Sequence, residues 1–246
     1  LILLISLLVL SCLPAKATVL VPEKALCPVG GESIDVYVVM SVYHSGDFDM
    51  DFKSYDPGSS LLTTYPECPS NGFVVFKKNF TSAEVDLLTA YVRSKEFLSA
   101  RNEKTNYRAY LLKRHLGGYS NGELADTLLR ATWQAKGFWQ YRKYAQEALT
   151  YYTKESERLR KQSTDEAFYT MHIRGELSRR LMKYWDAYWV FDFQVIREGA
   201  EGNRYQALAR HQKWAMLFLW FGKLPATDQG FLRAVYRRFL QDRSYF

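Results

Sequence analysis

Two short segments of this chain share the skeleton Cys-Pro-x-x-Gly, one beginning at Cys27 and the other at Cys68. Between them, residues 34–42 alternate in character and are rich in Val, Tyr and Ile, which predicts a strand. Residues 73–76, directly after the second segment, predict another short strand. The repeated skeleton and the strands indicate a small β-containing head over residues 18–80.

Helical patterns replace strand patterns after this head. Thr81 and Glu84 have the spacing of a capping box, and apolar residues then recur at helical spacing, less regularly as far as Phe97. Ser120 opens a second such pattern with Glu123. Further helices are expected over residues 138–161, 165–181, 184–198, 203–221 and 227–242.

The expected fold class is therefore mainly α, or α+β over the whole chain. Short breaks between successive helices predict antiparallel neighbours, so residues 81–246 should form an antiparallel helical body. Charge supports two modules, because residues 18–81 carry four basic and eight acidic side chains, whereas residues 136–246 carry twenty basic and twelve acidic ones. The basic side chains are interspersed with acidic ones, which favours a solvated helical surface over a nucleic-acid partner.

The paired Cys-Pro segments resemble the two knuckles of a zinc ribbon, which read C-P-x-C-G and together supply four thiolates to one tetrahedral ion. Here Gly30 and Asn71 stand where each knuckle has its second Cys. Two thiols alone do not complete a closed zinc site. The head is therefore predicted to be a degenerate zinc ribbon, with no metal ligands.

The order of these segments also resembles the bacterial domain-of-unknown-function family 2225. The resemblance rests on the two Cys-Pro-x-x-Gly segments, the acidic and aromatic stretch 47–52 between them, and residues 175–181 with Tyr184 and Ala187 beyond them. It implies a zinc-ribbon-like head and a tetratricopeptide-like body, without an established activity or catalytic residues. The two substituted knuckle positions depart from the family pattern, so metal binding is not carried over.

This departure suggests another use for the two cysteines that remain. The first cysteines of opposite knuckles face the same ion, so the sulfurs of Cys27 and Cys68 should lie close enough to bridge if the geometry permits. Export would bring them into an oxidising compartment, and loss or lipidation of Cys12 would leave an even count. We predict a Cys27–Cys68 disulfide that contributes about 3–4 kcal/mol by closing a loop of about 40 residues. Two buried free thiols, or a retained metal, are the alternatives.

One segment of the expected helical body matches a single tetratricopeptide unit. Small and aromatic residues alternate there at the spacings of that repeat: Gly175, Tyr184, Ala187 and Phe191. The small residues would let two helices approach, and the aromatic residues would fill the gap between them. The pattern is not kept one repeat length away on either side, so the body is expected to be only tetratricopeptide-like.

Aromatic residues cover most sides of the same expected helix. One face holds Tyr184, Tyr188 and Phe191. Another face holds Trp185, Trp189 and Phe193. A helix that is apolar on most sides is usually central in a bundle, so this cluster is predicted to be core rather than a ligand groove.

The first residues have the layout of a secretory signal peptide. An apolar run over residues 1–10 is followed by Pro14 and by an A-x-A site that ends at Ala17. We expect cleavage after Ala17 and export to the periplasm or cell envelope, with no membrane span. Residues 9–12 loosely resemble a lipobox, so a lipid anchor at Cys12 is an alternative.

Three acids at alternate positions, Asp47, Asp49 and Asp51, imitate the start of a calcium loop. An EF-hand needs Gly at loop position six and Glu at position twelve, but Phe52 and Gly58 stand there. We therefore expect acids on the exposed face of a strand and no calcium site.

No motif in the chain points to catalysis. Neither a P-loop nor a G-x-S-x-G elbow occurs, and none of the four histidines has a ligand at helical spacing. We expect no cofactor and predict a non-enzymatic exported scaffold that binds a protein or peptide partner, as helical-repeat proteins do. The alternative is an envelope enzyme or small-ligand binder with a pocket between the head and the body.

Overall fold

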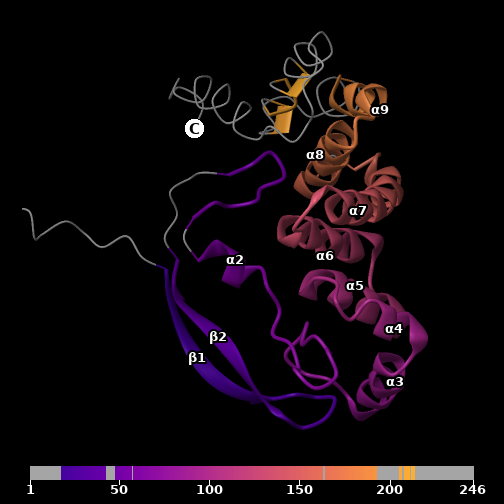
Figure 1. Ribbon diagram of the computed structural model, residues 1–246. Coiled ribbons are helices and arrows are strands. Elements are labelled where there is room, and N and C mark those ends of the chain that lie inside the picture. Colours follow the sequence, from indigo (N-terminus) through magenta and orange to yellow (C-terminus); the bar gives the residue numbers. More distant parts are fainter. Residues whose placement is uncertain are drawn as a thin grey trace, which may run out of the picture. The chain divides into compact units, whose positions relative to one another are not determined.

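A computed structural model describes residues 18–42, 48–56, 58–162, 164–192, 205–206, 208–210 and 212–213. These residues are mainly helical and include one small antiparallel sheet, which confirms the predicted fold class (Figure 1). The signal segment 1–17 and the helix expected over 227–242 lie outside them, and the helix expected over 203–221 lies inside only in part. Within the described ranges, no helix combines the length and the apolar character needed to cross a bilayer.

The chain divides into two compact units. The first extends as far as Tyr119 and also includes residues 133–135. The second comprises residues 120–132 and everything after residue 135. The first unit therefore takes in, besides the predicted head, the helices that lie before Tyr119.

The sheet of the first unit is a hairpin. Strand β1 (Val19–Leu26) pairs antiparallel with strand β2 (Ser33–Ser41), and the first Cys-Pro turn connects them. The predicted strand 34–42 is therefore present as β2. Sequence analysis does not predict β1, because Pro22 and the charged Glu23 and Lys24 interrupt its apolar pattern.

The strand predicted over residues 73–76 is not formed. This segment makes a single β-bridge, between Glu67 and Val74. Its aromatic side chains fill the core of the first unit instead, with the ring of Phe76 edge-on to Phe80 at a centroid distance of 5.2 Å. The apolar run that resembles a strand is thus used for packing without a neighbouring strand.

The helices of the first unit are α2 (Ser59–Leu62), α3 (Ser82–Val92), α4 (Lys95–Ser99) and α5 (Thr105–Leu116). The predicted capping box opens α3, since the Thr81 hydroxyl accepts from the Glu84 N–H and the Glu84 carboxylate accepts from the Thr81 N–H. The pattern expected to reach Phe97 is broken, because Ser94 caps a separate helix, α4. Sequence analysis does not predict α5, whose N-terminus has no side-chain cap.

The helices of the second unit are α6 (Asn121–Gln134), whose last two residues belong to the first unit, α7 (Phe138–Leu159), α8 (Asp165–Arg180) and α9 (Tyr184–Trp189). The predicted capping box at Ser120 is present, with reciprocal bonds of 3.2 and 2.8 Å to Glu123. Helix α7 packs against α8, and α8 packs against α9 (Figure 1). Helix α9 is followed by a π-helical turn over residues 190–192, and the rest of the helix predicted over 184–198 lies outside the described residues.

Candidate functional site

The two Cys-Pro turns of the first unit have the same backbone geometry. In each turn the N–H of the Cys donates to the carbonyl five residues on, Glu32 in one and Phe73 in the other, at 2.8 Å in both. The N–H of the Gly four residues on donates back to the Cys carbonyl, at 3.0 Å for Gly31 and 2.9 Å for Gly72. Both glycines have positive φ, 74° and 73°, a conformation that favours Gly. The shared skeleton therefore specifies one turn made twice.

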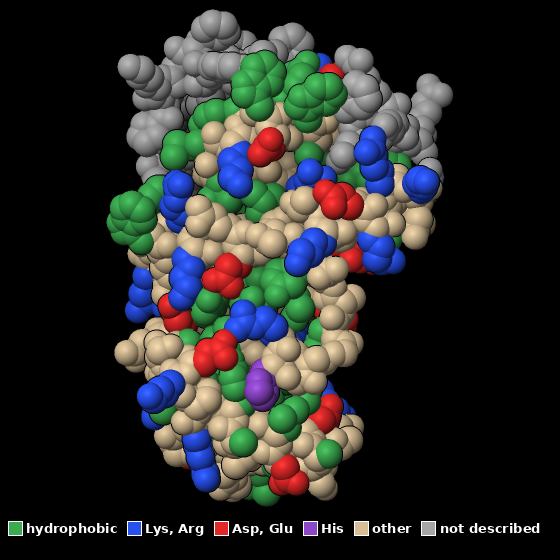
Figure 2. Space-filling view, turned by 90° about the vertical axis from the view of Figure 1, so that its right-hand side faces the viewer, with side chains coloured by type: hydrophobic (Ala, Val, Ile, Leu, Met, Phe, Trp, Pro, Cys, Tyr) green, Lys and Arg blue, Asp and Glu red, His purple; other side chains and the backbone are tan. Residues whose placement is uncertain are grey.

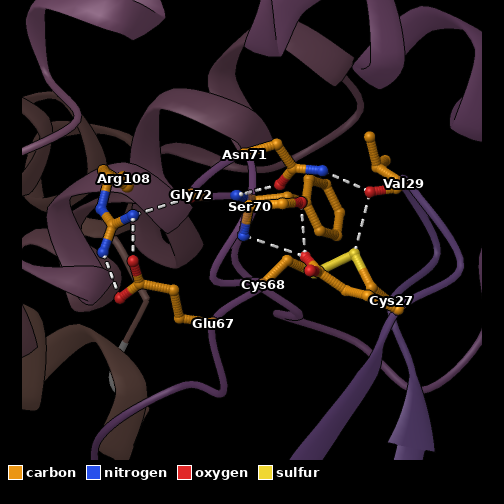
Figure 3. Close-up of a disulfide and its surroundings, with 10 residues drawn as sticks. Cys27, Val29, Glu67, Cys68, Ser70, Asn71, Gly72 and Arg108 are labelled. Atoms are coloured by element: carbon orange, nitrogen blue, oxygen red, sulfur yellow. Dashed lines mark hydrogen bonds and ion pairs between the residues drawn. A yellow bond between two sulfur atoms is a disulfide. The ribbon is translucent and has the colours of Figure 1, made fainter.

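The two turns lie against each other and are joined through their cysteines (Figure 3). The Sγ atoms of Cys27 and Cys68 are 2.07 Å apart, and their Cα atoms are 5.9 Å apart. Both side chains are buried. The predicted pair thus lies at the distance of a disulfide, and it closes a sequence separation of 41 residues.

The positions where zinc knuckles have their second Cys also face each other. A Cβ atom added to Gly30 would lie 3.3 Å from Nδ2 of Asn71. The Asn71 amide donates to the Val29 carbonyl and accepts from the Phe73 N–H at 2.8 Å (Figure 3). Asn71 therefore ties the second turn to the first with hydrogen bonds, beside the cysteine pair.

Glu32 is a member of this cluster that sequence reasoning missed. The ligand atoms of Cys27, Glu32 and Cys68 all lie within 4.8 Å of one another. Ser70 holds the Glu32 carboxylate, since its N–H and its hydroxyl donate to Oε1 at 3.2 and 2.7 Å. The feature of the sequence that could have indicated Glu32 is its position directly after Gly31, one residue beyond the Cys-Pro-x-x-Gly skeleton.

Arg108 of α5 fastens the second turn to the helices of the first unit. Its guanidinium donates to both carboxylate oxygens of Glu67, at 3.0 and 2.6 Å, and to the carbonyl of Gly72 at 2.7 Å (Figure 3). The Arg108 side chain is buried, so this bidentate pair compensates the charge that burial removes from water. The turn is therefore held from two sides, by the cysteine pair and by Arg108.

The aspartates expected on an exposed strand lie in a tight turn, so that expectation is wrong for Asp49 and Asp51. The carboxylate of Asp51 is fully buried and accepts hydrogen bonds from the indole N–H of Trp133, at 2.9 Å, and from the N–H of Lys53, at 3.2 Å. Phe52 adopts a positive φ of 62° at this turn. Asp47 lies outside the described residues.

The tetratricopeptide-like residues lie where α8 meets α9. A Cβ atom on Gly175 would lie 2.5 Å from Cε1 of Phe191, far closer than packing allows, so the contact requires Gly. Ala187 and Phe191 are fully buried, and Tyr184 is half-buried at the first residue of α9. Phe191 therefore packs against Gly175, where a larger side chain would not fit, and the likeness to a tetratricopeptide repeat stays a prediction.

The second aromatic face of α9 is exposed, so the prediction of a core helix is wrong for this face. Trp185 and Trp189 are 62% and 56% exposed, and Met182, which precedes α9, is 50% exposed. The prediction of a core position is correct for Phe191, and Phe193 lies outside the described residues. Figure 2 shows exposed hydrophobic side chains over the upper part of the view, where α9 lies. We call Met182, Trp185 and Trp189 the α9 face.

A buried ion cluster lies in α8, within the segment of the family resemblance. Arg179 donates to both carboxylate oxygens of Glu176, at 2.8 and 2.7 Å, and Arg180 donates to one of them. Burial raises the pKa of Glu176, but the charges and hydrogen bonds of Arg179 and Arg180 outweigh burial and lower this pKa to about 2. The carboxylate is therefore ionised at neutral pH, and its negative charge offsets part of the positive charge of the two arginines.

Three comparisons with known proteins give no information on function. No family model, no curated protein and no solved structure matches this chain. The resemblance to family 2225 accordingly stays a prediction, as does the zinc-ribbon ancestry of the head.

Proposed function

We propose that this protein is an exported, non-enzymatic protein that binds a protein or peptide partner through the α9 face. The observation that carries the proposal is the exposure of Trp185 and Trp189, which are four residues apart on one helix. Trp is enriched among the few residues that dominate binding energy at interfaces. Apolar side chains grouped on a surface mark such interfaces, whereas single exposed ones are ordinary.

The opposite side of α9 is packed within the second unit, which supports the α9 face. Phe191, just beyond the helix, is locked against Gly175 of α8, and Ala187 is fully buried. A partner that docks on Trp185 and Trp189 would therefore meet side chains on a fixed backbone. Binding to a rigid surface loses less conformational entropy, which favours affinity.

Export is the second part of the proposal. A disulfide persists in oxidising compartments, and the cysteine pair supports the periplasm or cell envelope that the A-x-A site at residues 15–17 predicts. A soluble mature chain that begins at Thr18 is the preferred form, and a lipid anchor at Cys12 is the alternative. The head would then be a zinc ribbon whose ion is replaced by a covalent link between Cys27 and Cys68.

Affinity capture from envelope extract, followed by mass spectrometry, tests the α9 face. The wild type is compared with the double variant Trp185→Ser/Trp189→Ser and with Trp139→Ser, which removes a tryptophan that is 78% exposed on α7. We expect a specific partner that the wild type and Trp139→Ser retain and the double variant loses. Equal recovery of the same proteins by all three chains would refute the assignment.

A further inference from the structure

We propose that the paired Cys-Pro turns bind one zinc ion when the bond between Cys27 and Cys68 is reduced, with Cys27, Cys68 and Glu32 as ligands. This inference is independent of the α9 face. It rests on the convergence of three ligand atoms, two sulfurs and a carboxylate oxygen, within 4.8 Å of one another. The three side chains come from both turns and from the residue that follows the first turn.

The donor set and its dimensions suit zinc. Zinc takes thiolate sulfur at about 2.3 Å and carboxylate oxygen at about 2.1 Å, and a tetrahedral site with three protein ligands leaves its fourth position to water. Two sulfurs on one tetrahedral zinc are then about 3.8 Å apart by simple geometry. The Cα atoms of Cys27 and Cys68 are 5.9 Å apart, so both side chains can reach one ion between the two turns.

Ser70 prepares Glu32 for this role. Its N–H and its hydroxyl both donate to Oε1 of Glu32, which fixes the orientation of the carboxylate beside the sulfurs. Neither of these bonds uses Oε2, the second oxygen of the carboxylate. Hydrogen bonds that orient a ligand in this way are a regular part of metal sites.

The disulfide and the zinc site exclude each other for a chemical reason. A dithiol reductant supplies two electrons and two protons to the S–S bond, giving two thiols on this chain while the reductant closes to its own disulfide. Zinc then displaces the two thiol protons and binds two thiolates. A sulfur in the S–S bond carries no thiolate charge, so the oxidised chain should stay free of zinc.

The two states would serve the same structural purpose. Either the covalent bond or the ion links the first turn to the second, and Asn71 and Arg108 hold the surrounding backbone in both. The reduced chain would therefore exchange one cross-link for another.

Zinc titration of the whole chain against a chromophoric chelator tests the site. The oxidised chain is compared with a chain reduced by a trialkylphosphine, which leaves no competing thiol. We expect about one zinc per reduced chain and far less than one per oxidised chain, because only the reduced chain offers two thiolates. Cobalt(II) should give the reduced chain a thiolate-to-metal charge-transfer band. Absence of stoichiometric zinc from the reduced chain would overturn the proposal.

Variants assign the ligands. Glu32→Gln keeps the size of the side chain but removes its charge. It should weaken zinc binding by at least about tenfold, because the loss of a residue that only orients a ligand already lowers metal affinity by about that factor. Glu23→Gln, on the exposed part of β1, is the matched control and should bind as the wild type does. Equal affinity in Glu32→Gln and the wild type would refute Glu32 as a ligand.

Protease resistance measures zinc binding even if the head unfolds on reduction, because bound zinc should fold it again. If reduction loosens the head, zinc should restore the resistance of the wild type and of Glu23→Gln, but restore that of Glu32→Gln only at higher zinc concentration. Restoration in the double variant Cys27→Ser/Cys68→Ser would show that zinc acts elsewhere and would contradict the site.

Discussion

At the scale of single residues, the head depends on pairs of side chains that lie far apart in the sequence. Cys27 meets Cys68, and Arg108 meets Glu67. A module of this size buries too little apolar surface to be very stable by packing alone. A covalent cross-link is therefore expected to contribute a large share of its stability.

Removing the cysteine pair should loosen the head. Cys27→Ser or Cys68→Ser is expected to lower the free energy of unfolding of the first unit by about 3–4 kcal/mol, because the unfolded chain regains the entropy of an open loop. Limited proteolysis should then cut residues 18–80 faster, while the helices of the second unit stay resistant. Glu23→Gln, on the exposed part of β1 and outside the pair, is the control. Equal resistance of the variants and the wild type would show that the bridge does not hold the head together.

Glu176 should make the stability of the second unit depend on acidity. Its pKa is about 2 in the folded chain and about 4.3 when unfolded, so its contribution is complete above about pH 4.3. The contribution, on the order of 3 kcal/mol, is lost as the pH falls towards 2.

Urea unfolding at pH 7 and pH 3 measures this dependence. Glu176→Gln should be less stable than the wild type at pH 7, because the buried Arg179 loses its partner, and the difference should shrink at pH 3. A difference that stays constant across this range would contradict the assignment of the ionised form.

At the scale of elements, the approach of α8 and α9 depends on one glycine. Gly175→Ala should destabilise the second unit by about 1–3 kcal/mol, since the added Cβ would meet Phe191 at 2.5 Å and overpacking outweighs the gain in helix propensity. Gly122→Ala in α6 is the matched control, because its Cβ would lie 3.5 Å from Glu155, an ordinary contact. Thermal unfolding compares the two, and the double variant Gly175→Ala/Phe191→Leu should recover stability. Equal melting temperatures in both single variants would refute the close packing.

At the scale of the whole molecule, the proposed export would bring the two cysteines of the head into an oxidising compartment. We expect intact-mass analysis of the mature protein to show Thr18 as its first residue, because the A-x-A site ends at Ala17. The mass should also lack the two hydrogens that a Cys27–Cys68 bond removes. A mature chain that begins with lipidated Cys12 would establish the anchored form, and a chain that retains residues 1–10 would refute export.

The sequence alone determined those features that depend on neighbours along the chain. The capping boxes at Thr81 and Ser120 are present because their hydrogen bonds join residues only three apart. The Cys-Pro-x-x-Gly skeleton likewise specifies a turn whose bonds span four and five residues. The cysteine pair could be predicted from the resemblance of the two segments to zinc knuckles, whose first cysteines face the same ion.

Only the tertiary structure decided the features that depend on contacts between residues far apart in the sequence. Residues 73–76 have the composition of a strand, yet among the described residues they make one β-bridge and contribute buried side chains to the core. Trp185 and Phe191 are both large aromatic residues, but Gly175 lies against Phe191, which is fully buried, whereas Trp185 is exposed. Glu32 joins the cysteines because Ser70, distant in sequence, holds its carboxylate. Local hydrogen bonds follow from sequence spacing, whereas burial and convergence follow from long-range packing, which spacing along one chain does not encode.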